Sequence, residues 1–430
     1  MSLPRRLFLQ RAGLASATAF LSSLARPAWS RQLRSAVDAA GRVPPGELAA
    51  DEDFWYYVQQ SFTVSAGLIN LNNGGVSPAP RSVQDAMKRY YDYSNEAPSY
   101  YMWRILDQGR ESVRSGLAAL AGCAPEEIAM NRNASEGLET IIFGLPLQAG
   151  DEVVAARQDY PHVVHALRQR ELRDRIRINW VNLELPSENE DALVQKYVQA
   201  FTPRTKAVNI THIINWNGQI LPVRRIADEA RKRGIDVLVD GAHSFAHFDF
   251  KIPDLHADYF ATSLHKWLYA PIGSGMLYVR KEKIGGIYPL FASEHPQESD
   301  IRKFEHLGTR PFFIEQAIGK ALEFHDMIGS ERKEKRLHYL KNYWMEKVKD
   351  LPNVQLHTST DPRWGCAIGM VSVKGRKPAE LDAYLFANHK IHTTTIDWEN
   401  IKGVRITPNV YTTTKNLDTL VAGITQFAKA

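Results

Sequence analysis

Residues 236–243 read DVLVDGAH and residues 259–267 read YFATSLHKW, and these two stretches decide the fold. Each begins with a short apolar run, which is typical of a buried strand, and ends in polar residues. Residues 223–230, just before the first stretch, have apolar residues at the spacing of a helix. A helix, a strand and a further strand in this rhythm predict a mostly parallel sheet that is covered by helices on both faces.

The same alternation extends over most of the chain. Further short apolar runs lie at residues 128–130, 153–156 and 207–210. Beyond about residue 310 the order changes to long amphipathic helices, short apolar runs near residues 353–358, 367–373 and 403–407, and a final helix. The sequence therefore predicts an α/β fold with a large domain over residues 71–310 and a smaller α+β domain over residues 311–430. Residues 31–70 contain Pro44-Pro45-Gly46 and are expected to form a linker and N-terminal segment.

Composition excludes several classes of protein. The chain has 430 residues, of which 44% are hydrophobic and 23% charged, so a disordered, collagen-like or coiled-coil protein is excluded. The net charge of +5 falls to +1 without the first 30 residues, which argues against a nucleic-acid or anionic membrane surface. Cys123 and Cys366 are too few for a disulfide framework and lack the spacing of metal ligands, so no metal site is expected. They are either bridged or two free thiols.

Residues 1–30 have the features of an export signal. Arg5-Arg6 is followed by Phe8-Leu9 and by a weakly apolar stretch over residues 12–25, with small residues near position 28. That stretch is shorter than the about 20 apolar residues that cross a bilayer, which favours a cleavable signal over a permanent membrane anchor. The pattern resembles the twin-arginine signal of bacteria, which implies export of the folded protein to the periplasm by the twin-arginine machinery. A basic tail is the alternative.

Polar residues follow several of the apolar runs, at the place where open α/β sheets bind ligands. Asn133, with Glu136 three residues later, predicts the N-cap of a helix whose free N–H groups suit a phosphate. Asp240 ends a buried strand, where a carboxylate is costly without a donor or a cation. It is either part of a structural ion pair or the partner of a cationic ring nitrogen.

Two basic residues lie in apolar surroundings. Lys266 is flanked by apolar and aromatic residues, and burial would lower its pKa and make the amine a nucleophile. Ser263 and His265, beside it, can hold a phosphate. Arg405 lies inside an apolar strand, where it requires a carboxylate from the protein or from a substrate. Each feature has an ordinary structural explanation, but together they are what pyridoxal phosphate chemistry requires.

At this spacing, Asp-Gly-Ala-His at 240–243 and Ser-Leu-His-Lys at 263–266 resemble the signature of class V aminotransferase-fold enzymes. The resemblance extends from LNNGG at 71–75 to Arg405, nearly the whole chain after the signal. It implies the type I fold of pyridoxal phosphate (PLP)-dependent transferases, with PLP as the cofactor. It also implies a catalytic group in which Lys266 binds the cofactor covalently, Asp240 pairs with its ring nitrogen and His243 lies near its phenolic oxygen.

The resemblance also assigns the remaining site residues. Implied cofactor contacts are Ala134, Ser135, Ser263 and His265 at the phosphate, Asn215 at the phenolic oxygen, and Tyr160 against the ring. Arg405 is implied to bind the substrate carboxylate, with Gly74 and Gly75 beside the substrate. Thr309, after Gly308, resembles the segment that a second subunit lends to the phosphate. The implied partners are therefore a second copy of the chain and an amino-acid-like or peptidic substrate.

The reaction stays open at this point. The resemblance implies that the substrate amine displaces Lys266, which then removes the Cα proton, and the outcome is epimerisation, transamination or loss of a side-chain group. Cysteine desulfurases of the family need a mobile Cys in a loop that here reads KIHTTT at 390–395, so persulfide chemistry is not expected. Residues 71–75 and 159–161 favour the isopenicillin N epimerase-like subgroup, and a periplasmic member of this fold tailors a glutamyl group of the siderophore pyoverdine.

Two alternatives to these interpretations remain. One is a C–S or C–N lyase of the same fold. The other is a protein of another class, namely a cofactor-free periplasmic binding protein or a nucleotide-dependent oxidoreductase. The last would carry Gly-x-Gly-x-x-Gly after an early strand, and the sequence has no such run.

Overall fold

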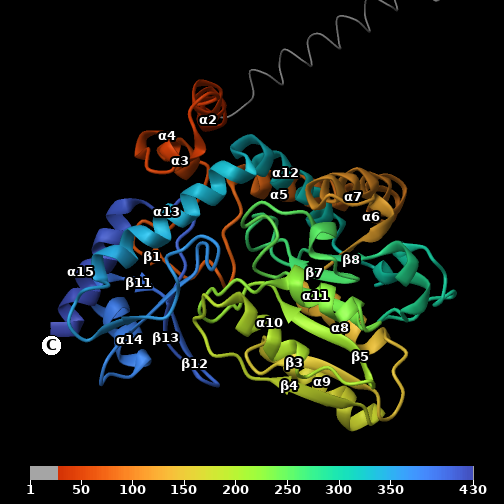
Figure 1. The fold of residues 1–430 in the computed structure, drawn as a ribbon. Helices are drawn as coiled ribbons and strands as arrows, with labels where there is room; N and C mark the ends of the chain where they lie inside the picture. Colours follow the sequence, from red (N-terminus) through yellow and green to blue (C-terminus); the bar gives the residue numbers. More distant parts are fainter. Residues whose placement is uncertain (1–27, 430) are drawn as a thin grey trace, which may run out of the picture.

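The computed structural model describes residues 28–429, and its centre is a seven-stranded sheet of order β2-β8-β7-β6-β5-β3-β4 (Figure 1). The strands are β2 (Ile128–Asn131), β3 (Glu152–Ala156), β4 (Arg177–Val181), β5 (Thr205–Thr211), β6 (Asp236–Asp240), β7 (Tyr259–Ser263) and β8 (Gly275–Val279). Only β8 runs antiparallel to its neighbours β2 and β7. The predicted α/β class and mostly parallel sheet are confirmed.

Helices cover both faces of this sheet, because successive strand residues are buried on opposite sides. Val237 and Leu238, for example, belong to two different apolar clusters. The helices of this part of the chain are α5 (Arg81–Glu96), α6 (Pro98–Tyr100), α7 (Asp107–Ala121), α8 (Ala134–Gly144), α9 (Pro161–Asp174), α10 (Glu190–Val198) and α11 (Val223–Arg231). A π-helix, η1 (Tyr101–Leu106), joins α6 to α7. The short 3₁₀ helices are η2 (Pro125–Glu127), η3 (Ile252–Leu255), η4 (Lys281–Gly286) and η5 (Ile301–Glu305).

The C-terminal part forms a second, antiparallel sheet of order β12-β13-β10-β9. Its strands are β9 (Val354–Leu356), β10 (Gly369–Val373), β12 (Thr394–Trp398) and β13 (Ile401–Ile406). The accompanying helices are α12 (Phe312–Ile328), α13 (Ser330–Val348), α14 (Pro378–His389) and α15 (Thr414–Lys429). A short strand β1 (Ile69–Asn70) pairs in parallel with β11 (Ile391–His392), so the segment before the large sheet is joined to the C-terminal part.

Residues 31–70, expected to form a linker and N-terminal segment, are folded and do not form a linker. The structure has helices α2 (Ala28–Ala39), α3 (Pro45–Leu48) and α4 (Glu52–Gln59) there. Pro45 occupies the first turn of α3, a position that starts helices, and Asp51 caps α4 by accepting from the Phe54 N–H at 3.1 Å. Leu33 and Trp55 are fully buried. The segment is therefore part of the folded body, because its apolar residues supply a helical face that the proline run does not interrupt.

The predicted signal over residues 1–30 lies outside the described residues, apart from the start of α2. Within residues 28–429, no helix combines the length and the apolar character needed to cross a membrane.

Candidate functional site

The site forms where β6 and β7 end next to each other. Because these strands pair in parallel, the turn after Asp240 lies beside the turn after Ser263. A cavity of about 370 Å³ opens there. It is lined by the predicted residues Gly74, Gly75, Ala134, Ser135, Tyr160, Asn215, Asp240, His243, Ser263, His265, Lys266 and Arg405. Among the residues predicted for the site, only Thr309 does not line the cavity.

Lys266 is held against an imidazole. Its Nζ lies 3.0 Å from His243 Nε2, and Trp267 Nε1 donates to His243 Nδ1 at 3.4 Å. Burial lowers the pKa of Lys266 to about 8, with Arg405 adding to the effect and Asp240 opposing it. Burial, together with the Lys266 and Arg405 charges, also lowers the pKa of His243 well below its ordinary value. Since the indole N–H occupies Nδ1, the neutral imidazole carries its proton on Nε2 and can donate it to the Lys266 amine when that amine is deprotonated.

Buried side chains hold the segment after Lys266 in place. The ring of His247 stacks on Trp267 with 3.7 Å between centroids and 9° between planes. His247 Nδ1 donates to the His243 carbonyl at 2.7 Å, so its Nε2 accepts from the Ala367 N–H at 3.0 Å. The buried Lys333 donates to the carbonyl of Trp267. These contacts hold His243 and Trp267, the neighbours of Lys266, in place.

Asp240 is a buried carboxylate without a counter-ion. It is 4% exposed, and its Oδ1 accepts from the Ala242 N–H at 2.9 Å. Burial raises its pKa, while that N–H and Lys266 oppose the shift. No ion pair to Asp240 is formed by any residue from 28 to 429. A carboxylate in this state is suited to accept from a protonated ring nitrogen.

The N-terminus of α8 meets the end of β7. Asn133 Oδ1 caps α8 by accepting from the Glu136 N–H at 2.9 Å, and the Ala134 N–H donates to Ser263 Oγ at 2.9 Å. His265 Nδ1 contacts the carbonyl of Ser274 at 3.1 Å. Helix N–H groups, a hydroxyl and an imidazole thus converge at the place where Ala134 and Ser135 line the cavity, and such a group can bind a phosphate.

Arg405 enters the cavity from β13. Its Nη1 donates to the Asn215 carbonyl and its Nη2 to Asn72 Oδ1, both at 2.8 Å. Burial lowers its pKa to about 10, so the guanidinium stays charged at neutral pH. Its Nε and the nearby Asn215 Oδ1 are buried and find no hydrogen-bond partner in the described part of the chain. A buried guanidinium bonded to neutral groups can receive a substrate carboxylate.

Aromatic rings line one side of the cavity. Tyr160 is 39% exposed and stacks on Trp216 at 6.4 Å, and Trp216 stacks on Trp398 of β12 at 5.4 Å. The sequence predicted Tyr160 but not the two tryptophans, because their contact joins segments that only the fold brings together.

Asp159 and Asn72 are two further residues near the site for which the sequence predicts no role. Asp159 is fully buried and accepts from Thr211 Oγ1 at 2.7 Å and from Asn209 Nδ2 at 2.8 Å. Burial raises its pKa to about 7. Asp159 follows the buried strand β3, much as Asp240 ends β6. A polar residue close to the end of a strand was therefore the signal from which the sequence could have predicted Asp159. Asn72, which positions Arg405, has no such signal.

The structure shows where the two cysteines lie, and where the stretch at 390–395 lies, in which a desulfurase of the family would need a mobile Cys. Cys123 and Cys366 are both free thiols and are therefore not bridged to each other. Burial raises the pKa of Cys123 to about 12. The stretch at 390–395 contains β11 and presents Thr394 to the cavity. Thr309 is exposed, in the loop between η5 and α12. The described residues contain no group of three or more His, Cys, Asp or Glu side chains placed to hold a metal ion.

The residues present fit pyridoxal phosphate. A lysine with a lowered pKa, an unpaired buried carboxylate, a capped helix N-terminus and an unpaired amide oxygen at Asn215 face one cavity. Fold and site together define a PLP-dependent enzyme of fold type I. The sequence profile of aminotransferase class V matches residues 69–416, and the chain belongs to that family.

Relatives and solved structures agree with this assignment. Isopenicillin N epimerase of Streptomyces clavuligerus is 26% identical over 386 residues, covering 85% of this chain and 96% of that protein. A probable cysteine desulfurase of Synechocystis is 24% identical and covers 71% of this chain and 75% of its own length. The apo cysteine desulfurase of Thermococcus onnurineus has the same fold, with a TM-score of 0.77, 21% identity, and 88% and 98% of the two chains covered.

Proposed function

We propose that the protein removes and returns the Cα proton of an amino-acid moiety, with epimerisation as the outcome. The observation that carries this proposal is the Lys266 amine, 3.0 Å from His243 Nε2 in a cavity that also holds Asp240 and Arg405. The similarity to isopenicillin N epimerases over nearly their full length supports the choice of outcome.

Each residue has a task in this reaction. When bound, PLP would be held by Lys266 and Asp240 and would withdraw electrons from Cα. Arg405 orients the substrate carboxylate. The amine of Lys266 would take the proton from Cα, and His243 keeps that amine aimed into the cavity. Tyr160 lines the same cavity with a hydroxyl group that can return a proton.

The thiol positions argue against desulfuration. A persulfide requires a Cys at the substrate, and the cavity is lined by Thr394 from the stretch that carries that Cys in desulfurases. Cys366 is buried, which raises its pKa. Transamination and elimination remain the competing outcomes, and both are measurable.

The test is proton exchange on the holoenzyme in D₂O. Amino acids and amino-acid amides are incubated with the enzyme, and Cα deuterium and chirality are followed by NMR and chiral chromatography. Epimerisation predicts deuterium at Cα together with both configurations. A keto acid product would instead establish transamination, and loss of a side-chain group would establish a lyase.

We further propose that the enzyme acts in the periplasm, on an amino-acid moiety of a peptide or siderophore. The support is the paired Arg5-Arg6 and the apolar stretch that follows. The test is cell fractionation of the wild type and of an Arg5→Lys, Arg6→Lys variant. Export by the twin-arginine route predicts periplasmic activity for the wild type and cytoplasmic retention of the variant.

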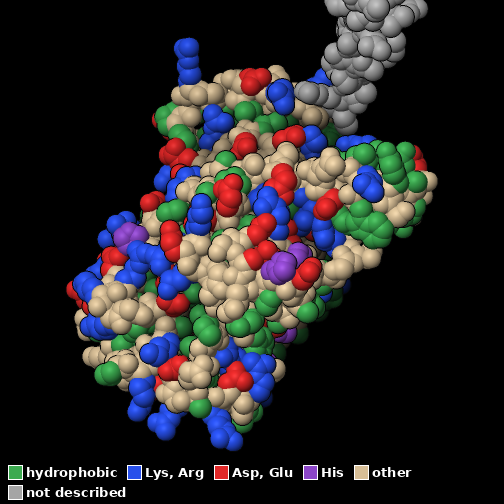
Figure 2. Space-filling view, turned by 90° about the vertical axis from the view of Figure 1, so that its right-hand side faces the viewer, with side chains coloured by type: hydrophobic (Ala, Val, Ile, Leu, Met, Phe, Trp, Pro, Cys, Tyr) green, Lys and Arg blue, Asp and Glu red, His purple; other side chains and the backbone are tan. Residues whose placement is uncertain are grey.

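A homodimer is proposed as the working form. Tyr100, Trp103 and Ile105 of α6 and η1 are 58%, 52% and 42% exposed, and Figure 2 shows a hydrophobic patch on that side of the molecule. Thr309 is exposed and apart from its own cavity, as a residue donated to a second copy would be. Light scattering on the purified holoenzyme tests this proposal, which predicts twice the chain mass.

A further inference from the structure

Asp159 is a buried carboxyl group to which the proposed reaction gives no task. It is fully buried, and no Lys, Arg or His of residues 28–429 forms an ion pair with it. Asp159 does not line the catalytic cavity, whereas Tyr160, the next residue in the chain, does. A carboxyl group buried without a cation is costly unless hydrogen bonds satisfy it, so the partners of Asp159 indicate what it holds.

Three donors are bonded to the Asp159 carboxyl group. Oδ2 accepts from the Ala156 N–H at 3.0 Å and from Asn209 Nδ2 at 2.8 Å, and Oδ1 accepts from Thr211 Oγ1 at 2.7 Å. Ala156 ends β3, so the first bond closes the turn that leads from this strand to Tyr160. The other two donors belong to β5, an inner strand of the large sheet, and they tie the turn to that strand.

The turn that Asp159 closes lies beside the catalytic residues. Thr211 lines the cavity and is the register partner of Asp240 in the parallel pair of β5 and β6. Tyr160 is the N-cap residue of α9, and it acts on the pKa of Arg405 in the direction opposite to burial, as a nearby phenol would. A shift of the turn would therefore move Tyr160 relative to the group that receives the substrate carboxylate.

The side chain of Tyr160 is not fixed by bonds of its own. Its phenol forms no hydrogen bond with the residues that the structure describes, and its ring stacks on His162 at 5.6 Å and on Trp216 at 6.4 Å between centroids. Since no bond anchors the phenol, its place at the cavity depends on the backbone turn that carries it.

Two tryptophans also contact this turn, but at residues before Asp159. Trp398 Nε1 donates to the Arg157 carbonyl at 3.0 Å, and Trp216 Nε1 donates to the Gln158 carbonyl at 2.9 Å. Both indoles are only partly buried. Asp159 is the residue of the turn that adjoins Tyr160, and its bonds to β5 are buried.

We propose that Asp159 is a positioning residue of the reaction, and that its bonds to β5 hold Tyr160 where the phenol can return a proton to the substrate. This inference rests on the proposed function. There, the Lys266 amine takes the proton from Cα, the Tyr160 phenol gives one to the opposite face of that carbon, and both groups then exchange their protons with water. Exchange at Cα needs only Lys266, whereas a change of configuration also needs the phenol. Loss of Asp159 should therefore reduce epimerisation more than exchange.

The variants separate the bonds of Asp159 from its charge and from its burial. Asp159→Ala removes all three bonds. Asp159→Asn keeps the shape, and its amide can use the same partners because a threonine hydroxyl both donates and accepts. Glu152→Ala is the matched control. Glu152 begins the same strand β3, is 2% exposed, and accepts from a threonine hydroxyl at 2.6 Å and an asparagine amide at 2.7 Å.

The first measurement compares two rates of the holoenzyme in D₂O, namely epimerisation and deuterium incorporation at Cα. In Asp159→Ala the ratio of epimerisation to incorporation should fall about tenfold or more, as it should in Tyr160→Phe. Asp159→Asn should keep the ratio within about twofold of the wild type because the bonds remain. The ratio should be unchanged in Glu152→Ala. An unchanged ratio in Asp159→Ala, or an equal fall in Glu152→Ala, would overturn the proposal.

The second measurement does not depend on the reaction. Tyr160 is replaced by 4-fluorophenylalanine, and fluorine NMR spectra of the holoenzyme are recorded. One narrow resonance is expected in the otherwise unchanged chain, in Asp159→Asn and in Glu152→Ala, and a shifted or broadened one in Asp159→Ala. If Asp159→Ala does not fold, Asn209→Ala removes one bond from the β5 side and should move the resonance in the same way.

The two measurements fail in different ways. The same fluorine resonance in all variants would show that Asp159 does not position residue 160, and would overturn the proposal. A keto acid or an elimination product in place of the epimer would instead overturn the proposed function and the task of the phenol, while the fluorine spectra would still decide whether Asp159 positions residue 160.

Discussion

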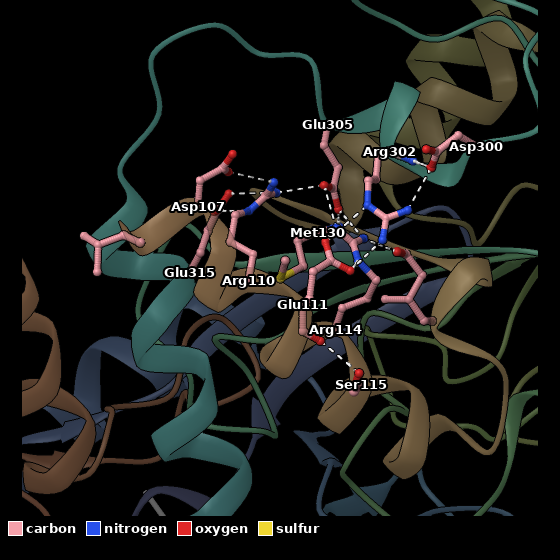
Figure 3. A network of polar contacts seen from close by, with 12 residues as sticks. Asp107, Arg110, Glu111, Arg114, Ser115, Met130, Asp300, Arg302, Glu305 and Glu315 are labelled. Carbon is pink, nitrogen blue, oxygen red and sulfur yellow. Dashed lines mark hydrogen bonds and ion pairs between the residues drawn. The ribbon is translucent and has the colours of Figure 1, made fainter. Parts of the chain in front are cut away.

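Among the places where the molecule buries charged side chains, two regions treat those charges in opposite ways. One is the buried ion cluster around Arg110, Arg114 and Glu305, where α7, η5 and α12 meet (Figure 3). The other is the catalytic cavity with Asp240 and Arg405. Every charge of the first region has an opposite charge in contact, whereas those of the second are bonded to neutral groups.

In the ion cluster the pairing is complete. Arg114, which is fully buried, donates to both carboxylate oxygens of Glu305 at 2.7 and 2.9 Å. Arg110 adds an ion pair to Glu305 at 2.9 Å, and the Met130 N–H donates to the same carboxylate at 2.7 Å. Glu305 lies just before the loop of Thr309. The cluster therefore anchors that loop against β2 and leaves no charge for a ligand.

In the catalytic cavity the chain compensates the desolvation cost only in part. Asp240 has a raised pKa and Lys266 and Arg405 have lowered ones, with burial as the largest cause each time. Buried charges are costly unless they are paired. Buried charges that face a cavity without an ion pair therefore point to a ligand, whereas fully paired charges, and a buried lysine bonded to backbone carbonyls such as Lys303, point to structure.

The largest effect is expected for Lys266→Ala. Turnover should fall by about 10⁴-fold or more, because the variant loses both the covalent hold on the cofactor and the base. Steady-state rates of the holoenzyme measure this. Lys303→Ala is the matched control, since Lys303 is also buried but donates to the carbonyls of Ile284 and Pro296. Wild-type activity in the Lys266 variant would break the comparison.

Asp240→Asn should come next. The amide keeps the shape of the carboxylate but not its charge, so turnover should drop about 10²–10³-fold while cofactor still binds. Rates and the cofactor absorption band, measured on the same preparation, separate the two effects. An active Asn variant would mean that the unpaired charge of Asp240 has no role in the reaction.

Glu305→Gln tests the other region. Removing this charge takes the central partner from two buried guanidinium groups, which keep only Glu315 and Glu111 beside them, so the free energy of unfolding should fall by about 3 kcal/mol. Urea denaturation measures the loss, and the absorption band of the folded holoenzyme should be unchanged. A variant as stable as the wild type would show that the pairing in Figure 3 contributes nothing to stability.

The smallest effect concerns pH. Only the neutral amine of Lys266 attacks PLP, and its pKa is lowered from 10.5 to about 8. The rate at which the cofactor-free protein takes up PLP should therefore rise about tenfold per pH unit below pH 8 and level off above it. Stopped-flow absorbance follows the uptake. A rise that continues to pH 10 would contradict the lowered pKa.

The sequence was sufficient to predict those site residues whose role depends on their position at the end of a strand. Asp240 and Lys266 stand at the ends of apolar runs, and parallel pairing of these strands brings them together without further information. The large sheet was predicted for the same reason, although β4 was missed because Arg177 and Asn179 interrupt its apolar pattern.

The sequence was insufficient where function depends on contacts between distant segments. Asn72 and Arg405 are 333 residues apart, and nothing near either one predicts their hydrogen bond. Trp216 and Trp398 meet only because β12 folds back towards the large sheet. Residues 31–70 were misread because Pro44 and Pro45 suggested a linker, whereas Trp55 is buried by contacts with α13 that lie far along the chain.

The most direct test of the central claim, that unpaired buried groups around Lys266 form a PLP site, is borohydride reduction of the holoenzyme followed by peptide mass mapping. Reduction fixes the cofactor to whichever lysine holds it. The account predicts one modified peptide, with the phosphopyridoxyl group on Lys266, and loss of the near-visible absorption band. A label on another lysine, such as Lys333 or Lys303, or a PLP-loaded protein that acquires no label, would contradict it.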